Sequence, residues 1–593
     1  MRKMLLAGVA ALLMTLPVGG ASAQPWATEG QKAAGRAALG LANGGRFPQA
    51  DAAALGADPL VRKIVTWLRL AQRGQATSGE LVAWLAENPD WPLPETMARR
   101  AEEALATDPD DSRALAHFER VPNRTLDGAQ RHADALSRAG RAGEAAAVLR
   151  NAWAAGFGDA AAEYTFAERN AAALTAEDRW RRFDRAFLAR DTAAAMRAAG
   201  FVDPARRAVA DARLAIASDR AEPVAASDDL GILAASAGAL RRRGADAQAA
   251  AVWAAAAPLQ RDLTPDAARG IWTERQVLVR RLLRAGEDRL AYQVAAAHGQ
   301  PGPSEARQEA EFLAGFVALR RLNEPATAAR HFARVGEGSS SVITRARALH
   351  WEARATTDAS RARALHEGAA AWPTAFYGQL SALALGETTA QLSARIRATV
   401  PQQPSAEATR LFPERELVQA AVALYDLGDA RRARIFLLRL EELSPDAADR
   451  VLIARLGNAM GRPDHAVWVS RRAGVDGVML LPEGWPAPYP MAPDILEPAI
   501  ANAITRQESN FEADVVSSAN AQGLMQLLPA TAAATARAMG IPHQVGWLRT
   551  DPAHNIRLGS RYLADQLARF GGTSRSLRRR TTRGRRGRRN GPR

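Results

Sequence analysis

The stretch ITRQESNFEADVVSSANAQGLMQLLP, residues 504–529, combines a helical run with a loop that ends at a helix-starting proline. The helical run closes with the Glu-Ser pair Glu508-Ser509. Fourteen residues after Ser509 the chain reads Gly-Leu-Met-Gln (523–526), and Pro529 follows shortly after. Proline is favoured in the first turn of a helix. We therefore expect a helix, a long loop and a second helix, with one carboxyl at the end of the first helix.

The first helix is expected to begin at Pro498. Ile500, Ala503, Ile504 and Gln507 follow at helical spacing, and Glu508 lies four residues after Ile504, so these last two side chains share one helix face. This face is apolar, and we expect it to point inward. Burial and the negative end of the helix dipole would both favour the protonated carboxyl. A general acid needs that property at neutral pH.

The loop offers candidates for packing and for recognition. Phe511 is expected to anchor the core, and Gly523 would let the backbone approach another segment closely. Gln526 is the better recognition candidate, because its amide can both donate and accept hydrogen bonds, whereas Met525 suits packing. Ser517 offers a hydroxyl. Taken singly, Ser517 and Gln526 would be expected to cap the loop and face solvent.

The order of these elements resembles the lytic transglycosylase family, whose catalytic domain has the goose-type lysozyme fold. By this resemblance Glu508 corresponds to the family's sole catalytic acid/base. Ser517, Gln526 and Met525 are placed among the residues of the sugar groove, whereas Ser509 and Gly523 are assigned structural roles near the site.

The resemblance continues downstream. Residues 551–556 (DPAHNI) and 558–563 (LGSRYL) match the family's next block. That helix packs behind the site in the family, so Asn555 and Tyr562 are expected to be structural. The motif-bearing match covers residues 495–573, about one seventh of the chain.

The presence of one catalytic carboxyl implies a particular mechanism. An ordinary glycosidase uses two carboxyl groups, but the family gives no role to Glu512 or Asp514, and we expect both at the surface. The resemblance implies cleavage between N-acetylmuramic acid (MurNAc) and N-acetylglucosamine (GlcNAc), assisted by the substrate's own N-acetyl group, with a 1,6-anhydro product. Two alternatives stay open: a hydrolytic muramidase on the same fold, and a catalytically inactive solenoid scaffold that binds peptidoglycan or proteins.

Composition favours an all-helical protein. Of 593 residues, 47% are hydrophobic and only 6% aromatic, and alanine, the best helix former, is very abundant. The chain has no cysteine, which removes disulfides, thiolate zinc sites and cysteine nucleophiles. No histidine pair at helical spacing suggests a metal site between residues 24 and 480. We assign neither metal nor cofactor.

The net charge of +15 is concentrated at one end of the chain. Residues 574–593 hold ten arginines and no acid, which leaves +5 for the remainder. The charges of the body therefore suit ordinary solvated helix faces rather than nucleic-acid binding.

The region from 24 to 480 predicts a helical array. The pattern Leu-x3-Gly-x4-Ala starts at Leu136, Leu240, Leu282 and Leu424, and Asn323 replaces Gly in a fifth copy. Gly or Asn would end one helix in the left-handed conformation, and the small Ala would let the next helix pack closely. Such pairs bury their apolar faces only when stacked, as in an α-solenoid. An irregular helical bundle is the alternative. The lytic transglycosylase family likewise carries a superhelical ring before its catalytic domain.

The two ends of the array are marked by other signals. Residues 1–23 read as a secretory signal peptide: Arg2 and Lys3, then an apolar run, then Ala-Ser-Ala. This predicts a periplasmic protein with no membrane anchor after cleavage. Its expected partners are peptidoglycan strands and cell-wall synthesis or assembly proteins. Four prolines within 482–490 predict a linker, 481–493, before a lysozyme-like domain, 494–573.

The C-terminus departs from the family. There the family continues with an apolar helix bearing an Ala-Tyr-Asn-Ala-Gly-Pro motif, whose Tyr contacts substrate, and no residue here replaces it. We therefore expect an incomplete catalytic domain followed by an Arg-rich tail, 574–593. The tail could bind anionic polymer, be plainly disordered, or be an out-of-frame reading of a GC-rich gene. We favour the last explanation, which resequencing would test. The activity of this chain depends on that segment.

Overall fold

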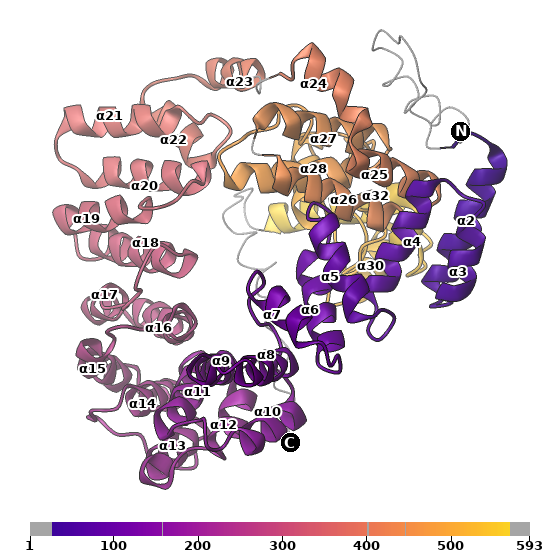
Figure 1. Ribbon diagram of the computed structural model, residues 1–593. Coiled ribbons are helices and arrows are strands. Elements are labelled where there is room, and N and C mark those ends of the chain that lie inside the picture. Colours follow the sequence, from indigo (N-terminus) through magenta and orange to yellow (C-terminus); the bar gives the residue numbers. More distant parts are fainter. Residues whose placement is uncertain (1–25, 157, 400–402, 445, 570–593) are drawn as a thin grey trace. The chain divides into compact units, whose positions relative to one another are not determined.

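The computed structural model describes residues 26–156, 158–399, 403–444 and 446–569, which are predominantly helical (Figure 1). Within this part of the chain, β pairing is limited to isolated bridges of Gln522 with Val516 and Leu527. The prediction of a mainly α chain is confirmed. The predicted signal peptide and the Arg-rich tail lie outside the described residues.

The chain forms two compact units. Residues 41–51 and 63–398 make up the solenoid unit, and residues 1–40, 52–62 and 399–593 make up the C-terminal unit. The last helices before the Pro-rich segment thus cluster with the helices after it. The domain boundary proposed at 481–493 stays a prediction, and this segment lies inside the C-terminal unit.

The helices have the following bounds. Three segments contribute to both units: α2 (Glu29–Asn43), α3 (Phe47–Ala54) and α4 (Pro59–Ala71). The solenoid unit then contains α5 (Ser78–Glu87), α6 (Pro94–Leu105), α7 (Asp111–Phe118), α8 (Leu126–Arg138), α9 (Ala142–Ala155), α10 (Ala160–Arg169), α11 (Ala176–Leu188), α12 (Thr192–Ala199), α13 (Pro204–Ala217), α14 (Leu230–Arg242), α15 (Asp246–Ala256), α16 (Pro265–Ala285), α17 (Asp288–Ala296), α18 (Glu305–Arg320), α19 (Pro325–Val335), α20 (Val342–Ala355), α21 (Ala359–Ala370), α22 (Phe376–Ala384) and α23 (Thr389–Ala398). The C-terminal unit contains α24 (Ala406–Leu411), α25 (Glu416–Asp426), α26 (Ala430–Leu443), α27 (Ala447–Ala459), α28 (Pro463–Val475), α29 (Pro498–Ser509), α30 (Pro529–Met539), α31 (Trp547–Thr550) and α32 (Pro552–Arg569).

Successive helices of the solenoid unit pack against each other as pairs, for example α8 with α9, α14 with α15 and α18 with α19 (Figure 1). The glycines of the repeated motif have the predicted left-handed conformation, with φ of 77° at Gly140, 83° at Gly244, 83° at Gly286 and 97° at Gly428. Asn323 has φ 55°. The prediction of helix pairs separated by left-handed turns is therefore confirmed.

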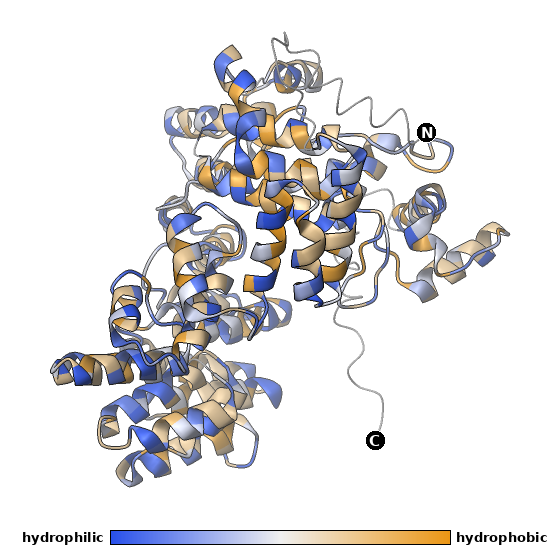
Figure 2. Cartoon of the chain, turned by 45° about the vertical axis from the view of Figure 1, so that its right-hand side comes forward, coloured by the Kyte–Doolittle hydropathy of each residue, from blue (hydrophilic) through white to orange (hydrophobic). Residues whose placement is uncertain are grey.

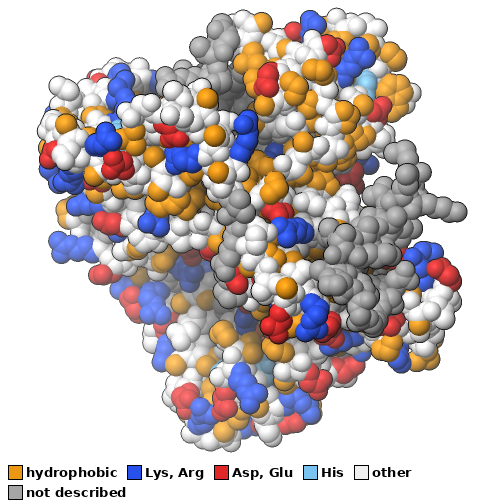
Figure 3. Space-filling model, turned by 90° about the horizontal axis from the view of Figure 1, so that it is seen from above, with side chains coloured by type: hydrophobic (Ala, Val, Ile, Leu, Met, Phe, Trp, Pro, Cys, Tyr) orange, Lys and Arg blue, Asp and Glu red, His pale blue; other side chains and the backbone are white. Residues whose placement is uncertain are grey.

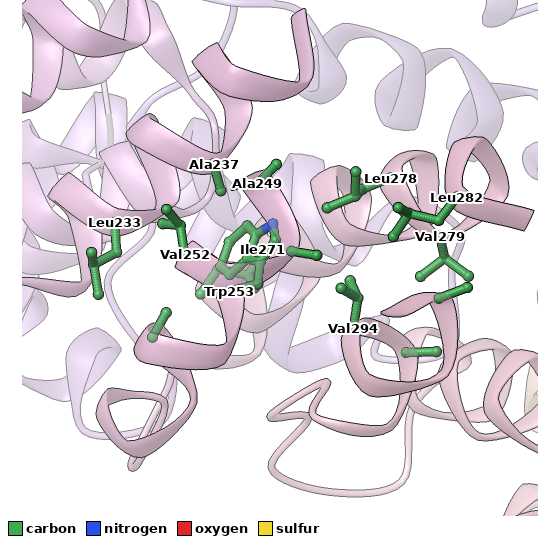
Figure 4. Close-up of a cluster of buried hydrophobic side chains, with 14 of the residues drawn as sticks. Leu233, Ala237, Ala249, Val252, Trp253, Ile271, Leu278, Val279, Leu282 and Val294 are labelled. Atoms are coloured by element: carbon green, nitrogen blue, oxygen red, sulfur yellow. The ribbon is translucent and has the colours of Figure 1, made fainter. Parts of the chain in front are cut away.

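Small and branched side chains fill the core between these helices. In the cluster of Figure 4, Trp253 from α15 lies among aliphatic side chains from α14, α16 and α17, including Leu233, Leu278 and Val294. Fully burying one such side chain contributes roughly 1.5–3 kcal/mol. Trp253 is 1% exposed, so it is a packing residue rather than a sugar-stacking surface.

The helices carry apolar and polar faces, seen as alternating orange and blue along single ribbons in Figure 2. On the face shown in Figure 3, basic and acidic side chains are interspersed. Neighbouring helices exchange ion pairs such as Arg321–Asp288 at 2.8 Å and Arg289–Glu324 at 2.7 Å; exposed pairs of this kind contribute about 1 kcal/mol or less. In the described part of the chain, no helix has both the length and the apolar character needed to cross a membrane.

A buried polar cluster joins α17, α18 and α19. Glu311 is 2% exposed. Its carboxylate contacts His298 Nε2 at 3.2 Å and His331 Nδ1 at 2.6 Å, and His331 Nε2 lies 3.1 Å from the Tyr292 hydroxyl. Burial acts to raise the pKa of Glu311, but the hydrogen bonds with the two histidines outweigh it and lower this pKa to about 2.

We expect Glu311 to make the solenoid unit sensitive to acid. Its folded-state pKa lies below the ordinary value of 4.5, so its stabilising contribution is complete above that pH and is lost as the pH falls towards 2. The shift corresponds to about 3 kcal/mol. In denaturant unfolding, the wild type should therefore have a higher unfolding free energy than Glu311→Gln above pH 4.5. This advantage of the wild type should shrink as the pH falls below 4.5. Glu305→Gln, at the start of the same helix, controls for loss of a carboxylate. A difference that stays constant with pH would contradict this assignment.

Candidate active site

Glu508 is the penultimate residue of α29. The helix begins with Pro498 in its first turn, and the side chain of Glu497 caps it by accepting hydrogen bonds from the amides of Ala499 and Ile500, at 3.1 and 3.0 Å. It ends at Asn510, which adopts φ 54°. A proline start, an acidic N-cap and a left-handed C-cap thus set the length of the helix. They place the carboxyl of Glu508 in its last turn.

The buried face of α29 differs from the expected one. Ala501, Thr505 and Ser509 are buried, whereas Ile500 is 41% exposed. The face shared by Ile504 and Glu508, which was expected to point inward, is only partly buried: Ile504 packs against the core cluster, whereas the fully buried stripe lies one position further along the helix. Small side chains there let α29 pack closely, with Ala501 in a cluster with Leu496, Met525 and Leu563. Glu508 is half-buried and adjoins this stripe on the helix.

The loop after α29 is held by one buried amide. Asn555, on α32, is 0% exposed. Its Oδ1 accepts from the amide of Met525 at 2.8 Å, and its Nδ2 donates to the carbonyls of Gln522 at 3.0 Å and Leu548 at 2.9 Å. Gly523 lies between Gln522 and the Met525 turn, beside Asn555, and has φ 74°. A Cβ at Gly523 would approach the Leu548 carbonyl oxygen closer than 3.0 Å. Asn555 therefore satisfies three backbone groups that burial would otherwise leave unpaired.

The polar residues singled out in the loop bond mainly to the loop itself. Ser517 Oγ accepts from the amide of Ala521 at 3.0 Å. Gln526 has φ 49° and its Nε2 donates to the carbonyls of Gly523 at 2.9 Å and Val515 at 3.3 Å. A serine hydroxyl retains a proton to donate, and a glutamine retains its amide oxygen as an acceptor. Ser509 Oγ donates to the Thr505 carbonyl at 3.1 Å and accepts from the Phe511 amide at 3.1 Å.

Two other predicted residues lie in the core of the domain. Met525 is 6% exposed and packs against Leu563 and over Gly559. Its place is that of a packing residue, so we leave it out of the substrate-binding residues proposed below. Tyr562 is half-buried and packs against the cluster of Leu527, Ala532, Ala536, Leu548 and Leu558.

Glu512 is not at the surface. It is 8% exposed, and its carboxylate lies 3.0 Å from Arg434 Nη1, on α26. The expectation of an exposed Glu512 is wrong, because a partner 78 residues earlier in the chain makes its burial favourable. Asp514 is exposed, as expected. No local sequence signal could have identified Arg434, since the pairing depends on how α26 packs against the loop.

Two arginines lie beside the C-terminal end of α29. Arg471, on α28, donates from Nη2 to the Arg506 carbonyl at 2.9 Å and to Gln507 Oε1 at 3.3 Å. The Arg506 guanidinium stacks over the Trp485 ring at 4.3 Å. Burial, and secondarily the neighbouring Arg471, lower the pKa of Arg506 to about 10. Sequence reasoning missed Arg471, which has no motif around it.

Other features do not compete with this site. In the described residues, no group of three or more His, Cys, Asp or Glu is arranged to hold a metal ion. A cavity of about 550 Å³ lies in the solenoid unit, lined largely by apolar side chains including Leu188, Trp253 and Ile271. Its two carboxylates, Glu274 and Asp211, are paired with Arg190 at 2.8 Å and Arg207 at 3.0 Å.

Known proteins match both parts of this arrangement. The Transglycosylase SLT domain family matches residues 492–582. A Haemophilus influenzae protein named as a soluble lytic murein transglycosylase is 49% identical over 63 residues, which is 11% of this chain and 11% of that protein. The alignment thus spans about a tenth of the curated relative.

Solved structures resemble nearly the whole chain. A crystal structure of an inactive mutant of the lytic transglycosylase Slt from Pseudomonas aeruginosa has a TM-score of 0.67 at 20% identity, covering 91% of this chain and 86% of that one. The 70 kDa soluble lytic transglycosylase of Escherichia coli has a TM-score of 0.60 at 18% identity, covering 92% and 88%. At this identity the likeness shows the fold: a superhelical array of helices followed by a lysozyme-like domain. Residues 492–582 thus match the Transglycosylase SLT domain family, and the chain has the fold of the soluble lytic transglycosylases of known structure.

Proposed function

We propose that this protein is a lytic transglycosylase that cleaves the β-1,4 bond between MurNAc and GlcNAc in peptidoglycan, with Glu508 as its acid and base. The observation that carries the proposal is Glu508 itself. It is a half-buried carboxyl in the last turn of α29, beside a loop held by Asn555, inside the match to the SLT domain. The similar proteins from H. influenzae, P. aeruginosa and E. coli are lytic transglycosylases, which supports the same activity.

The chemistry can proceed with one carboxyl. Glu508 donates its proton to the glycosidic oxygen, and the bond from that oxygen to C1 of MurNAc breaks. The N-acetyl oxygen of the same sugar supports the positive charge that develops at C1. Glu508, now a carboxylate, takes the proton of the C6 hydroxyl, whose oxygen bonds to C1. The products are a 1,6-anhydroMurNAc end and a GlcNAc end, and no water is consumed.

The residues near Glu508 in the sequence are consistent with a mechanism in which the substrate's N-acetyl group replaces a second carboxyl. A glycosidase with two catalytic carboxyls needs the second within several ångströms and free to act. Glu512 is instead bound to Arg434 and buried, which leaves the substrate's N-acetyl group as the natural stabiliser. The free proton of Ser517 and the free amide oxygen of Gln526 are suited to bind sugar hydroxyl or N-acetyl groups beside Glu508.

The proposed site of action is the periplasm, where peptidoglycan lies. This rests on the signal peptide read from residues 1–23. Peptidoglycan strands are the proposed substrate, with cell-wall synthesis or assembly proteins as a second class of partner.

The test is to incubate the purified full-length protein with peptidoglycan and to determine the masses of the released fragments. Anhydro ends are the expected result, because the C6 hydroxyl rather than water attacks C1. Fragments heavier by one water would instead identify a hydrolytic muramidase. Binding to peptidoglycan without any released fragment would identify the inactive scaffold and contradict the proposed activity.

A further inference from the structure

The turn that follows Glu508 has an unfavourable backbone conformation. Asn510 and Phe511 are consecutive residues with φ of 54° and 69°. The left-handed region costs an L-residue roughly 1–2 kcal/mol, less for Asn than for a bulky side chain such as Phe. Such a turn persists only where its surroundings hold it. Contacts from outside α29 must therefore fix the end of the helix that carries Glu508.

Phe511 is the first of these contacts. It is 2% exposed and packs against Val467 of α28, as well as against Leu524 and Ile556. Its carbonyl accepts a hydrogen bond from the Tyr489 hydroxyl at 3.4 Å. The next residue, Glu512, pairs with Arg434 of α26. The backbone on the C-terminal side of Glu508 is thus attached to helices that precede the Pro-rich segment.

Arg471 is the contact on the N-terminal side of Glu508. Its guanidinium bonds to the carbonyl of Arg506, two residues before Glu508. The same carbonyl accepts the amide of Asn510 at 3.1 Å, the bond that closes the last turn of α29. A cation beside the last carbonyls of a helix also meets the negative end of its dipole. Arg471 and the amide of Asn510 therefore donate to the same carbonyl, and the turn that this carbonyl closes contains Glu508.

We propose that Arg471 is a positioning residue for Glu508, through which α28 fixes the orientation of the catalytic carboxyl. The proposal rests on the assignment of Glu508 as the acid and base. It places the last helix before the Pro-rich segment within the catalytic machinery, although no residue of that helix carries a family motif. Removing the guanidinium loosens the last turn of α29 and leaves the carboxyl in a distribution of orientations.

A competing role for Arg471 is direct binding of substrate. Peptidoglycan stem peptides carry carboxylates, which a guanidinium can bind. Loss of a substrate contact would raise KM, whereas loss of positioning lowers kcat and leaves KM nearly unchanged. The two roles are therefore separable by kinetics.

Arg472 provides a matched control on the same helix. It bonds through Nε to Glu441 at 2.9 Å and through Nη2 to Glu442 at 2.7 Å, both on α26. Arg472→Met therefore removes the same side-chain charge from α28, together with two ion pairs to α26, without removing a contact to α29.

The experiment compares the wild type, Arg471→Met, Arg471→Lys and Arg472→Met as full-length proteins. Amide hydrogen exchange is followed across residues 503–512, cleavage of peptidoglycan strands gives kcat and KM, and thermal unfolding monitors the fold. We expect Arg471→Met to lower kcat on the order of 10-fold, since a misplacement of roughly 1 Å can cost 10²-fold. Exchange of the Asn510 amide should accelerate by a similar factor. Arg471→Lys should recover part of both losses, because an ammonium can still donate to the Arg506 carbonyl.

Unchanged kcat and exchange in Arg471→Met would overturn the proposal, as would an equal fall in kcat in Arg472→Met. A rise in KM alone would assign Arg471 to substrate binding instead. If the wild type releases no fragments, the proposed function fails. Hydrogen exchange then still decides whether Arg471 holds the end of α29.

Discussion

Glu508→Gln is expected to lower the rate of peptidoglycan cleavage on the order of 10³-fold or more, because one residue would supply both the proton donor and the base. The amide keeps the size of the carboxyl but neither donates an acidic proton nor accepts one from the C6 hydroxyl. Glu508 is half-buried at the edge of α29, so the substitution should leave the melting temperature nearly unchanged.

The measurement is the rate of fragment release, analysed by mass, under single-turnover conditions. Asp514→Asn is the matched control, because it makes the same carboxyl-to-amide change six residues later, on an exposed side chain of the loop after α29. This control should retain wild-type activity. Comparable activity of Glu508→Gln and the wild type would reject Glu508 as the acid and base, whichever product is formed.

Gly523→Ala is expected to reduce the unfolding free energy of the C-terminal unit by about 4 kcal/mol. The left-handed φ of 74° costs an alanine about 1–2 kcal/mol. Its Cβ would also come closer than 3.0 Å to the Leu548 carbonyl oxygen and to Nδ2 of Asn555. Overpacking of this kind costs about 1–3 kcal/mol, and displacement of Asn555 would leave buried backbone groups unpaired.

Gly540→Ala separates the clash from the backbone conformation. Gly540 ends α30 with a similar φ of 65°, but a Cβ there would meet no atom within 4 Å. Its cost should be limited to about 1–2 kcal/mol. Chemical denaturation of both variants gives the comparison. Equal losses of unfolding free energy in Gly523→Ala and Gly540→Ala would contradict the prediction, because the clash with Leu548 and Asn555 would then add nothing to the cost of the left-handed conformation.

The helical architecture was predictable because its determinants are local. Alanine-rich segments favour helices, and the repeated glycines mark left-handed turns that any helix pair of this geometry needs. Gly140, Gly244 and Gly286 show the expected conformation. The division of the chain into compact units was less accessible, because it depends on which helices pack together. Residues 399–480 belong to the same compact unit as the residues after the Pro-rich segment. No local sequence pattern predicts this grouping.

The residues of the candidate site could be predicted from the sequence, but their burial and their contacts could not. A glutamate followed by a Gly-Leu-Met-Gln loop can be recognised from residue order alone. The burial of Glu512 was not predictable from the sequence, since its partner Arg434 comes from α26. The exposure of Ile500, in the first turn of α29, was likewise not predictable from the spacing of apolar residues. Hydrophobic periodicity gives the spacing of a helix face, but the face that is buried depends on what packs against it.

The amino-acid sequence by itself determined the helical class, the left-handed turns of the helix pairs, and Glu508 as the candidate acid in an SLT-type motif. These follow from local propensities and from residue order. Only the tertiary structure decided that Glu508 lies at the border of a buried stripe, that Asn555 ties down the loop beside it, and that Arg434 and Arg471 hold the backbone on either side of it. Those contacts join residues about 30 to 80 positions apart, and such pairings arise from packing, for which a linear pattern carries no signal.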